Sequence, residues 1–107
     1  IGAFLDESIY DQIRANISGV MADEDVYLEV FVEDMKYSDT PISATISENL
    51  ADLYQEFYNF IASVNDATTS VQRSMIMQCK DDFNAFWGQT LCNVLRALHN
   101  IHFIKEF

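Results

Sequence analysis

The chain has 107 residues, of which 17 are acidic and 6 are basic, so that it carries a net charge of -11 at pH 7. Half of the residues are hydrophobic, and only three Gly and one Pro occur. This composition excludes a disordered chain and is poor in the turn residues that a sandwich or barrel needs. The charge disfavours direct binding to nucleic acid or to an anionic membrane, since both require a cationic surface.

All of the excess negative charge lies in one half of the sequence, since residues 1–56 hold thirteen acids and two bases and residues 57–107 hold four of each. This half is predicted either to meet a cationic partner or only to keep the protein soluble. No segment has the length and apolar character of a membrane span or signal peptide. Cys79 and Cys92 lie thirteen residues apart on one expected helix and cannot form a disulfide there. We therefore expect one reduced, cytoplasmic domain over residues 1–107.

The first predicted helix covers residues 5–18, where four aliphatic side chains recur every four residues: Leu5, Ile9, Ile13 and Ile17. Gly19 predicts its C-terminal end. Residues 23–35 are ambiguous, because they alternate as in a strand and also share one helical face. A strand here would lack a partner within the chain, so we predict a helix, with a strand that pairs across a dimer as the alternative.

Residues 38–41 are predicted to form a loop, and Thr45 with Glu48 forms a capping box that opens the next helix. One face of that helix is apolar and is predicted to lie in the core: Leu50, Leu53, Tyr54, Phe57, Ile61 and Val64. After a polar link at residues 65–70, the apolar period continues to Ile101, as one helix or as two that separate near residues 80–82. The predicted fold class is all-α, a bundle of four or five helices with a long, mostly buried C-terminal helix.

The stretch FWGQTLCNVLRALH, residues 86–99, is the most distinctive of the chain. Gly88 within a helix costs about 1 kcal/mol relative to Ala, which a large ring packed close to it would explain. The alternative is a ligand pocket with Gly88 as its floor and Trp87 and Gln89 as its walls. Arg96 is predicted to brace this helix to a carboxylate of the acidic half, or else to form an anion site with neighbouring amides. The candidate binding residues are Trp87, Gln89, Asn93, Arg96 and Asn100.

The sequence lacks the motifs of catalytic and metal-binding proteins. Neither His follows a Glu at the three-residue spacing of di-iron bundles, and Leu28 stands where a calcium loop starting at Asp23 needs Gly. Cys92 and His99 lie two helical turns apart, too far for one to activate the other. Phosphate-binding and nucleophile-elbow motifs do not occur. We therefore predict no enzyme activity, no metal and no cofactor.

Two stretches, ENLADLYQEF at residues 48–57 and FWGQTLCNVLRALH, resemble an uncharacterised bacterial family of small acidic helical domains, catalogued as domain of unknown function 5063. The resemblance covers roughly the second half of the chain and implies an all-helical fold without implying an activity. Together with the wide apolar arcs and the acidic half, it leads us to expect a non-catalytic module that binds another protein or itself. The alternatives are a helical domain that binds a small molecule or anion, and an acidic decoy that occupies a nucleic-acid-binding protein.

Overall fold

The computed structural model describes residues 4–29 and 42–105, with side chains placed as far as residue 101. In chain order the elements are helix α1 (Glu7–Met21), a 3-10 turn (Ala22–Glu24), strands β1 (Val26–Glu29) and β2 (Ile42–Thr45), helices α2 (Ile46–Asn65) and α3 (Thr69–Asp82), a π-helical segment (Phe83–Trp87) and helix α4 (Gly88–Lys105).

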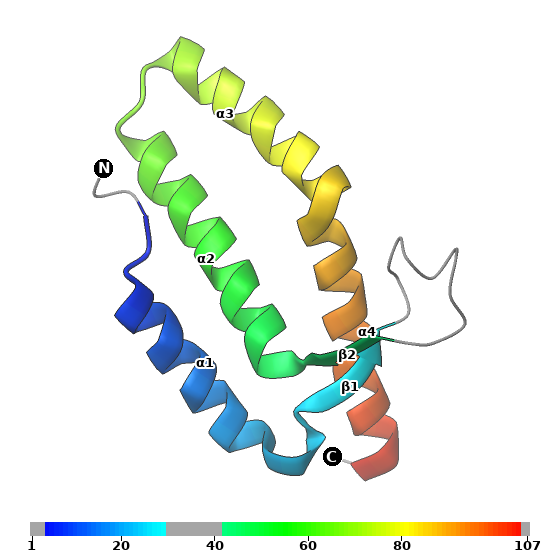
Figure 1. Ribbon diagram of the computed structural model, residues 1–107. Coiled ribbons are helices and arrows are strands. Elements are labelled where there is room, and N and C mark those ends of the chain that lie inside the picture. The colour runs from blue at the N-terminus through cyan, green and yellow to red at the C-terminus, as the bar shows by residue number, and fades with distance from the viewer. Residues whose placement is uncertain (1–3, 30–41, 106–107) are drawn as a thin grey trace.

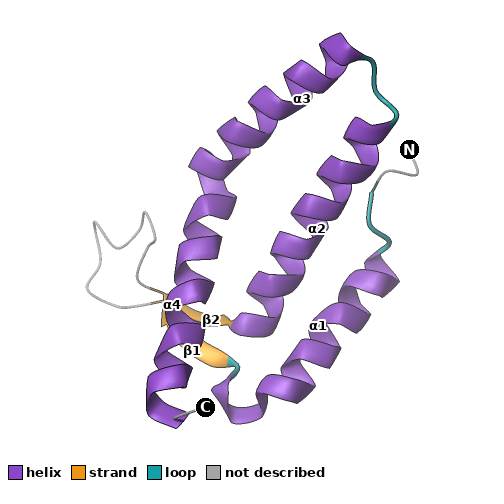
Figure 2. Cartoon of the chain, turned by 180° about the vertical axis from the view of Figure 1, so that it is seen from behind, coloured by secondary structure: helices purple, strands orange, loops and turns teal. Residues whose placement is uncertain are grey.

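The helices form a single layer of three rods that lie side by side (Figure 1). Helix α2 occupies the middle and packs against α1 on one side and against α3 and α4 on the other. The two strands cross α4 on one face of this layer, and the view from behind shows α4 in front of them (Figure 2). One face of the layer therefore carries the hairpin, and the opposite face of the three rods does not.

The fold is mostly helical, as predicted, but it differs from a bundle of four or five separate helices. α3, the π-helical segment and α4 follow one another without a loop, so they form one long rod. This continuity answers the question that the sequence left open at residues 80–82. The long C-terminal helix is present, although it is not mostly buried. Leu91 is 39% exposed and Leu95 is 63% exposed.

A two-stranded antiparallel sheet replaces part of the helix predicted at residues 23–35. β1 pairs with β2 in the register Val26 to Thr45 and Glu29 to Ile42. The partner strand lies in the same chain, directly before the capping box, so the dimer-pairing alternative is also wrong for β1. Residues 30–35 and the loop predicted at residues 38–41 lie outside the described residues.

The first helix begins and ends later than its sequence pattern predicts. Asp6 caps it, since its carboxylate accepts a hydrogen bond from the amide of Ser8 at 2.8 Å. The helix then continues through Gly19 to Met21, so the predicted stop at Gly19 is wrong. The chain turns instead at Ala22, which takes a positive φ of 49°. A glycine thus lies inside the helix, and an alanine takes the positive φ at which the helix ends.

The start of α2 agrees with its prediction. The amide of Glu48 donates to Oγ1 of Thr45 at 3.2 Å, and α2 ends at Asn65, where the polar link was expected. Its first turns pack against α4 to form the core of the protein. The buried hydrophobic cluster consists of Ile46, Leu53, Val94, Ala97 and Ile101. This cluster lies where α2, α4 and the hairpin meet, so the core is at one end of the layer.

Candidate functional site

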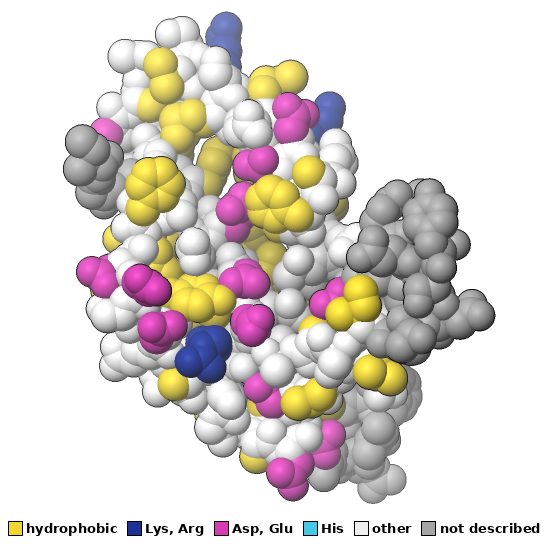
Figure 3. All heavy atoms as spheres, in the orientation of Figure 1, with side chains coloured by type: hydrophobic (Ala, Val, Ile, Leu, Met, Phe, Trp, Pro, Cys, Tyr) yellow, Lys and Arg dark blue, Asp and Glu magenta, His cyan; other side chains and the backbone are white. Residues whose placement is uncertain are grey.

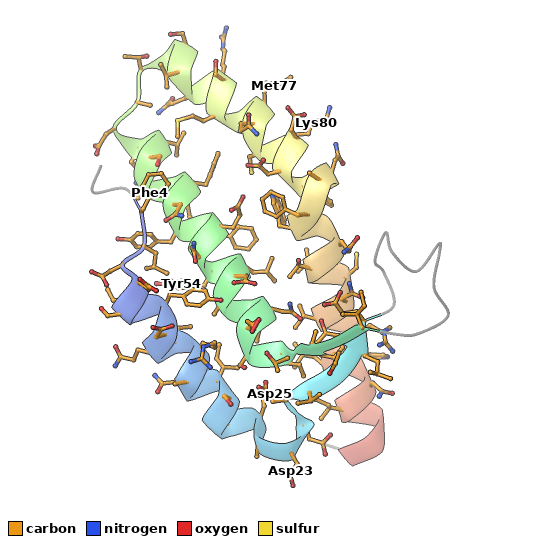
Figure 4. The ribbon with its side chains drawn as sticks, in the orientation of Figure 1. Phe4, Asp23, Asp25, Tyr54, Met77 and Lys80 are labelled. Atoms are coloured by element: carbon orange, nitrogen blue, oxygen red, sulfur yellow. The ribbon has the colours of Figure 1, made fainter. Side chains whose placement is uncertain are left out.

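A buried carboxylate joins the hairpin to the first turn of α2. Asp25 is 6% exposed, and it accepts hydrogen bonds from the amide of Ser47 at 2.8 Å and from its hydroxyl at 2.6 Å. The amide of Ile46 donates to the backbone oxygen of Asp25 at 2.8 Å. Figure 4 shows Asp25 beneath the start of α2, whereas Asp23 points away from the molecule. Asp25 therefore satisfies donors that a helix N-terminus leaves unpaired.

Sequence analysis did not single out Asp25 as a structural residue. It is one of three consecutive acids, and its neighbours in the sequence give no sign that it alone is buried. The contact joins two residues that are 22 positions apart, so only the fold identifies it.

Three aromatic rings pack together next to the glycine of the long rod. Trp87 packs edge-on against Phe57 of α2, with ring centroids 5.1 Å apart, and against Phe83, at 4.8 Å. Its indole N–H donates to the backbone oxygen of Cys79 at 3.3 Å. A Cβ added to Gly88 would lie 2.6 Å from the ring of Phe83. The close ring that the sequence analysis invoked for Gly88 is therefore present, and it comes from the preceding π-helical turn.

The five predicted binding residues do not form one site. Trp87 borders a groove between α2 and the long rod, whereas Arg96 and Asn100 line a separate hollow beneath the hairpin. Asn93 is buried, with 1% of its surface exposed, and Gln89 lies on the exposed surface of α4. Trp87 and Gln89 lie about 160° apart around the helix axis. The structure therefore brings only Arg96 and Asn100 together.

Arg96 does connect α4 to the acidic half of the chain, through a backbone oxygen of β1. Its Nη2 donates to the carbonyl oxygen of Leu28 at 2.6 Å, and its buried Nε has no hydrogen-bond partner among the described residues. Glu24 lines the same hollow. Burial, together with the charge of Glu29, raises the pKa of the neighbouring Tyr27 to about 12, and the charge of Arg96 opposes that rise. The hollow therefore has acidic groups around its one arginine, which disfavours an anion.

Acidic side chains gather on the face of the layer that carries the hairpin (Figure 3). There the hydroxyl of Tyr10 donates to Oδ1 of Asp52 at 2.5 Å, which joins α1 to α2. Burial raises the pKa of Glu56, and the charge of Asp82 on the facing helix raises it further. We call this surface the acidic face and define it by Asp11, Asp52, Glu56 and Asp82.

The opposite side of the layer is apolar. On α2, Tyr54 lies about 160° around the helix axis from Glu56, so it points away from the acidic face. On α4, Arg96 points to the hairpin, and Leu91 lies about 140° around the axis from it. We call this second surface the apolar face and define it by Tyr54, Tyr58, Ile61, Ile76, Leu91 and Leu95, which are between 39% and 63% exposed.

The apolar face includes residues that their sequence pattern assigns to a core. On α2, Tyr54 and Ile61 belong to the predicted core face, yet they are 48% and 55% exposed. Tyr54, Tyr58 and Ile61 line a hollow of about 420 Å³ whose walls come from α2 alone. The rings of Tyr54 and Tyr58 stack there, with their centroids 6.2 Å apart. A side of α2 with the composition of a core therefore has no covering element among the residues that the structure describes.

Within residues 4–29 and 42–105, His, Cys, Asp and Glu nowhere form a group of three or more that could hold a metal ion. No helix in that part of the chain combines the length and apolar character that crossing a membrane requires.

The comparisons with known proteins agree with the helical fold. The family model named "Domain of unknown function (DUF5063)" matches residues 3–103. The crystal structure of protein BF1032 from Bacteroides fragilis is similar, with a TM-score of 0.71 and 30% sequence identity. The similarity covers 92% of this chain and 54% of that chain, so this chain spans about half the length of the solved protein. No curated protein matches the chain.

Proposed function

The chain belongs to the family of domains of unknown function DUF5063, and we propose that it is a non-catalytic module that binds another protein through its apolar face. The observation that carries this proposal is the exposure of six large hydrophobic side chains on one side of a helical layer. Large hydrophobic side chains that are exposed together on one side often mark interaction sites on folded proteins.

The arrangement of the apolar face fits a protein ligand. Two stacked tyrosines and the aliphatic residues around them form a shallow surface along several helices, whereas small-molecule sites are concave and enclose most of the ligand. Tyrosine is enriched at protein interfaces because it adds a large contact area with a polar tip. An amphipathic helix or a helical layer is the kind of partner that such a surface accommodates.

Site-specific photo-crosslinking tests this proposal. A photoreactive phenylalanine analogue replaces Tyr58 on the apolar face in one sample and Asp11 on the acidic face in a matched control, and both proteins are irradiated in cells. We expect covalent protein adducts, identified by mass spectrometry, from position 58 and few from position 11. Adducts that form only at position 11 would instead favour the acidic decoy, and an absence of adducts at position 58 would refute the proposal.

A further inference from the structure

We propose that the partner on the apolar face is a second copy of this chain, packed face to face so that the two acidic faces point outward. This inference rests on the proposed function, because it names the protein that the same surface binds. Its first support is the size of the core. The buried hydrophobic cluster contains five residues at one end of a single helical layer, whereas stable domains bury their apolar surface between two layers.

The charge distribution permits two such acidic chains to meet on this side. The acids of α2 are Glu48, Asp52 and Glu56, and helix geometry places each of them away from the side of Tyr54 and Ile61. Helix α4 has no acid between Gly88 and Lys105. Two chains of charge -11 can therefore pack through their apolar faces without placing carboxylates against each other, whereas contact through the acidic faces would be repulsive.

The side of the layer that holds the apolar face is large enough for a stable dimer. The protein measures 47 × 33 × 23 Å, and the apolar face lies on the broad side of this layer. A standard interface needs about 800 Å² from each partner, which is less than a surface of these dimensions offers. Symmetric contact also suits the shape of the face, because α2 contributes a hollow and α4 contributes protruding leucines, of which Leu95 is 63% exposed.

Sedimentation equilibrium of the purified chain tests the proposal between about 1 and 100 µM. We expect a dimer of the 12.3 kDa chain. Ile61→Glu places a charge in the centre of the apolar face and should raise the dissociation constant at least 100-fold or so. The matched control is Val71→Glu, because Val71 is similarly exposed, at 48%, but lies on the side of the acidic face. It is two turns from Gln78 on the same side of α3, and Gln78 lines a hollow together with Glu56. The control should remain dimeric.

Leu95→Glu serves as a second variant in case Ile61→Glu does not fold, and circular dichroism checks both. A wild-type chain that is monomeric at every concentration would overturn the second-copy proposal. So would a dimer that is lost in Val71→Glu and retained in both apolar-face variants. Monomeric wild type that still forms adducts through position 58 would leave the proposed function standing, which separates the two failures.

Discussion

Replacing Gly88 by alanine should destabilise the protein although alanine is the better helix former. In an open helix the change would gain about 1 kcal/mol. Here the new Cβ would lie 2.6 and 2.7 Å from the ring of Phe83 and 2.7 Å from its backbone oxygen. The ring can shift, but the oxygen belongs to the helix backbone and cannot rotate away. Such overpacking costs about 1–3 kcal/mol, so the net loss should be up to about 2 kcal/mol.

The matched control is Gly19→Ala in α1. The same Cβ at Gly19 meets no atom within 4 Å, so only the gain in helix propensity remains, up to about 1 kcal/mol. Thermal unfolding followed by circular dichroism at one protein concentration compares the two variants. A loss of 1 kcal/mol lowers the melting temperature by roughly 4–8 °C in a domain near this size.

Opposite shifts of the melting temperature are the expected result, down for Gly88→Ala and up for Gly19→Ala. A variant that combines Gly88→Ala with Phe83→Ala removes two of the three short contacts and should lose less than the sum of the single changes. If Gly88→Ala raised the melting temperature as Gly19→Ala does, the packing explanation for this glycine would be wrong.

Three further changes test other parts of the structure. Asp25→Ala leaves two buried donors at the start of α2 without an acceptor and should lower the free energy of unfolding, measured by urea denaturation, by about 2–3 kcal/mol. Asp23→Ala changes an exposed side chain and should lower it by less than about 0.5 kcal/mol. Arg96→Leu removes the hydrogen bond to β1 and should accelerate amide hydrogen exchange in that strand; unchanged exchange would contradict this role. Glu56→Gln should raise the melting temperature at pH 7. Since burial and Asp82 raise the pKa of Glu56 above 4.5 in the folded state, folding favours its protonated form. Wild-type stability should therefore rise as the pH falls from 7 through that raised pKa, and less so in Glu56→Gln.

Local signals in the sequence predicted α2 well. The capping residue Thr45, the period of α2 and the polar link after it depend on neighbours within a few positions, and the structure agrees with all three. Gly88 was also interpreted correctly, because a glycine inside a strongly apolar helix indicates a close contact, and the ring of Phe83 supplies it.

The sequence did not predict the sheet, because neither of its two strands has a clear sequence pattern on its own. Val26–Glu29 fits a strand and a helix equally well, and Ile42–Thr45 is too short to show a period. Antiparallel pairing between them joins residues that are 13 positions apart at Glu29 and Ile42 and 19 apart at Val26 and Thr45, and it stabilises both strands at once. Asp25 escaped notice for the same reason, since its partner Ser47 is distant in sequence.

The candidate binding residues failed to converge because a helical wheel assigns a side of a helix but not its surroundings. The apolar stripe of α4 runs through Leu91, Val94 and Leu98, and the wheel identifies it correctly. The structure buries Asn93, Val94 and Ala97, whose common direction is rotated by about 90° from the centre of that stripe. The polar stripe that includes Arg96 therefore faces the hairpin instead of forming a pocket.

That rotation is the basis for expecting the proposed partner on the apolar face. If α4 had evolved only to pack on α2, Leu91 and Leu95 would have no physical reason to be apolar, because both lie on the side away from the hairpin and are partly solvent-exposed. The same offset occurs on α2, where Tyr54 and Ile61 continue the predicted core face beyond the buried cluster. Two helices that pack on each other thus extend their apolar stripes toward the same side of the layer. Chance exposure of single hydrophobic residues would not give them a common direction, whereas one covering layer on that side requires it.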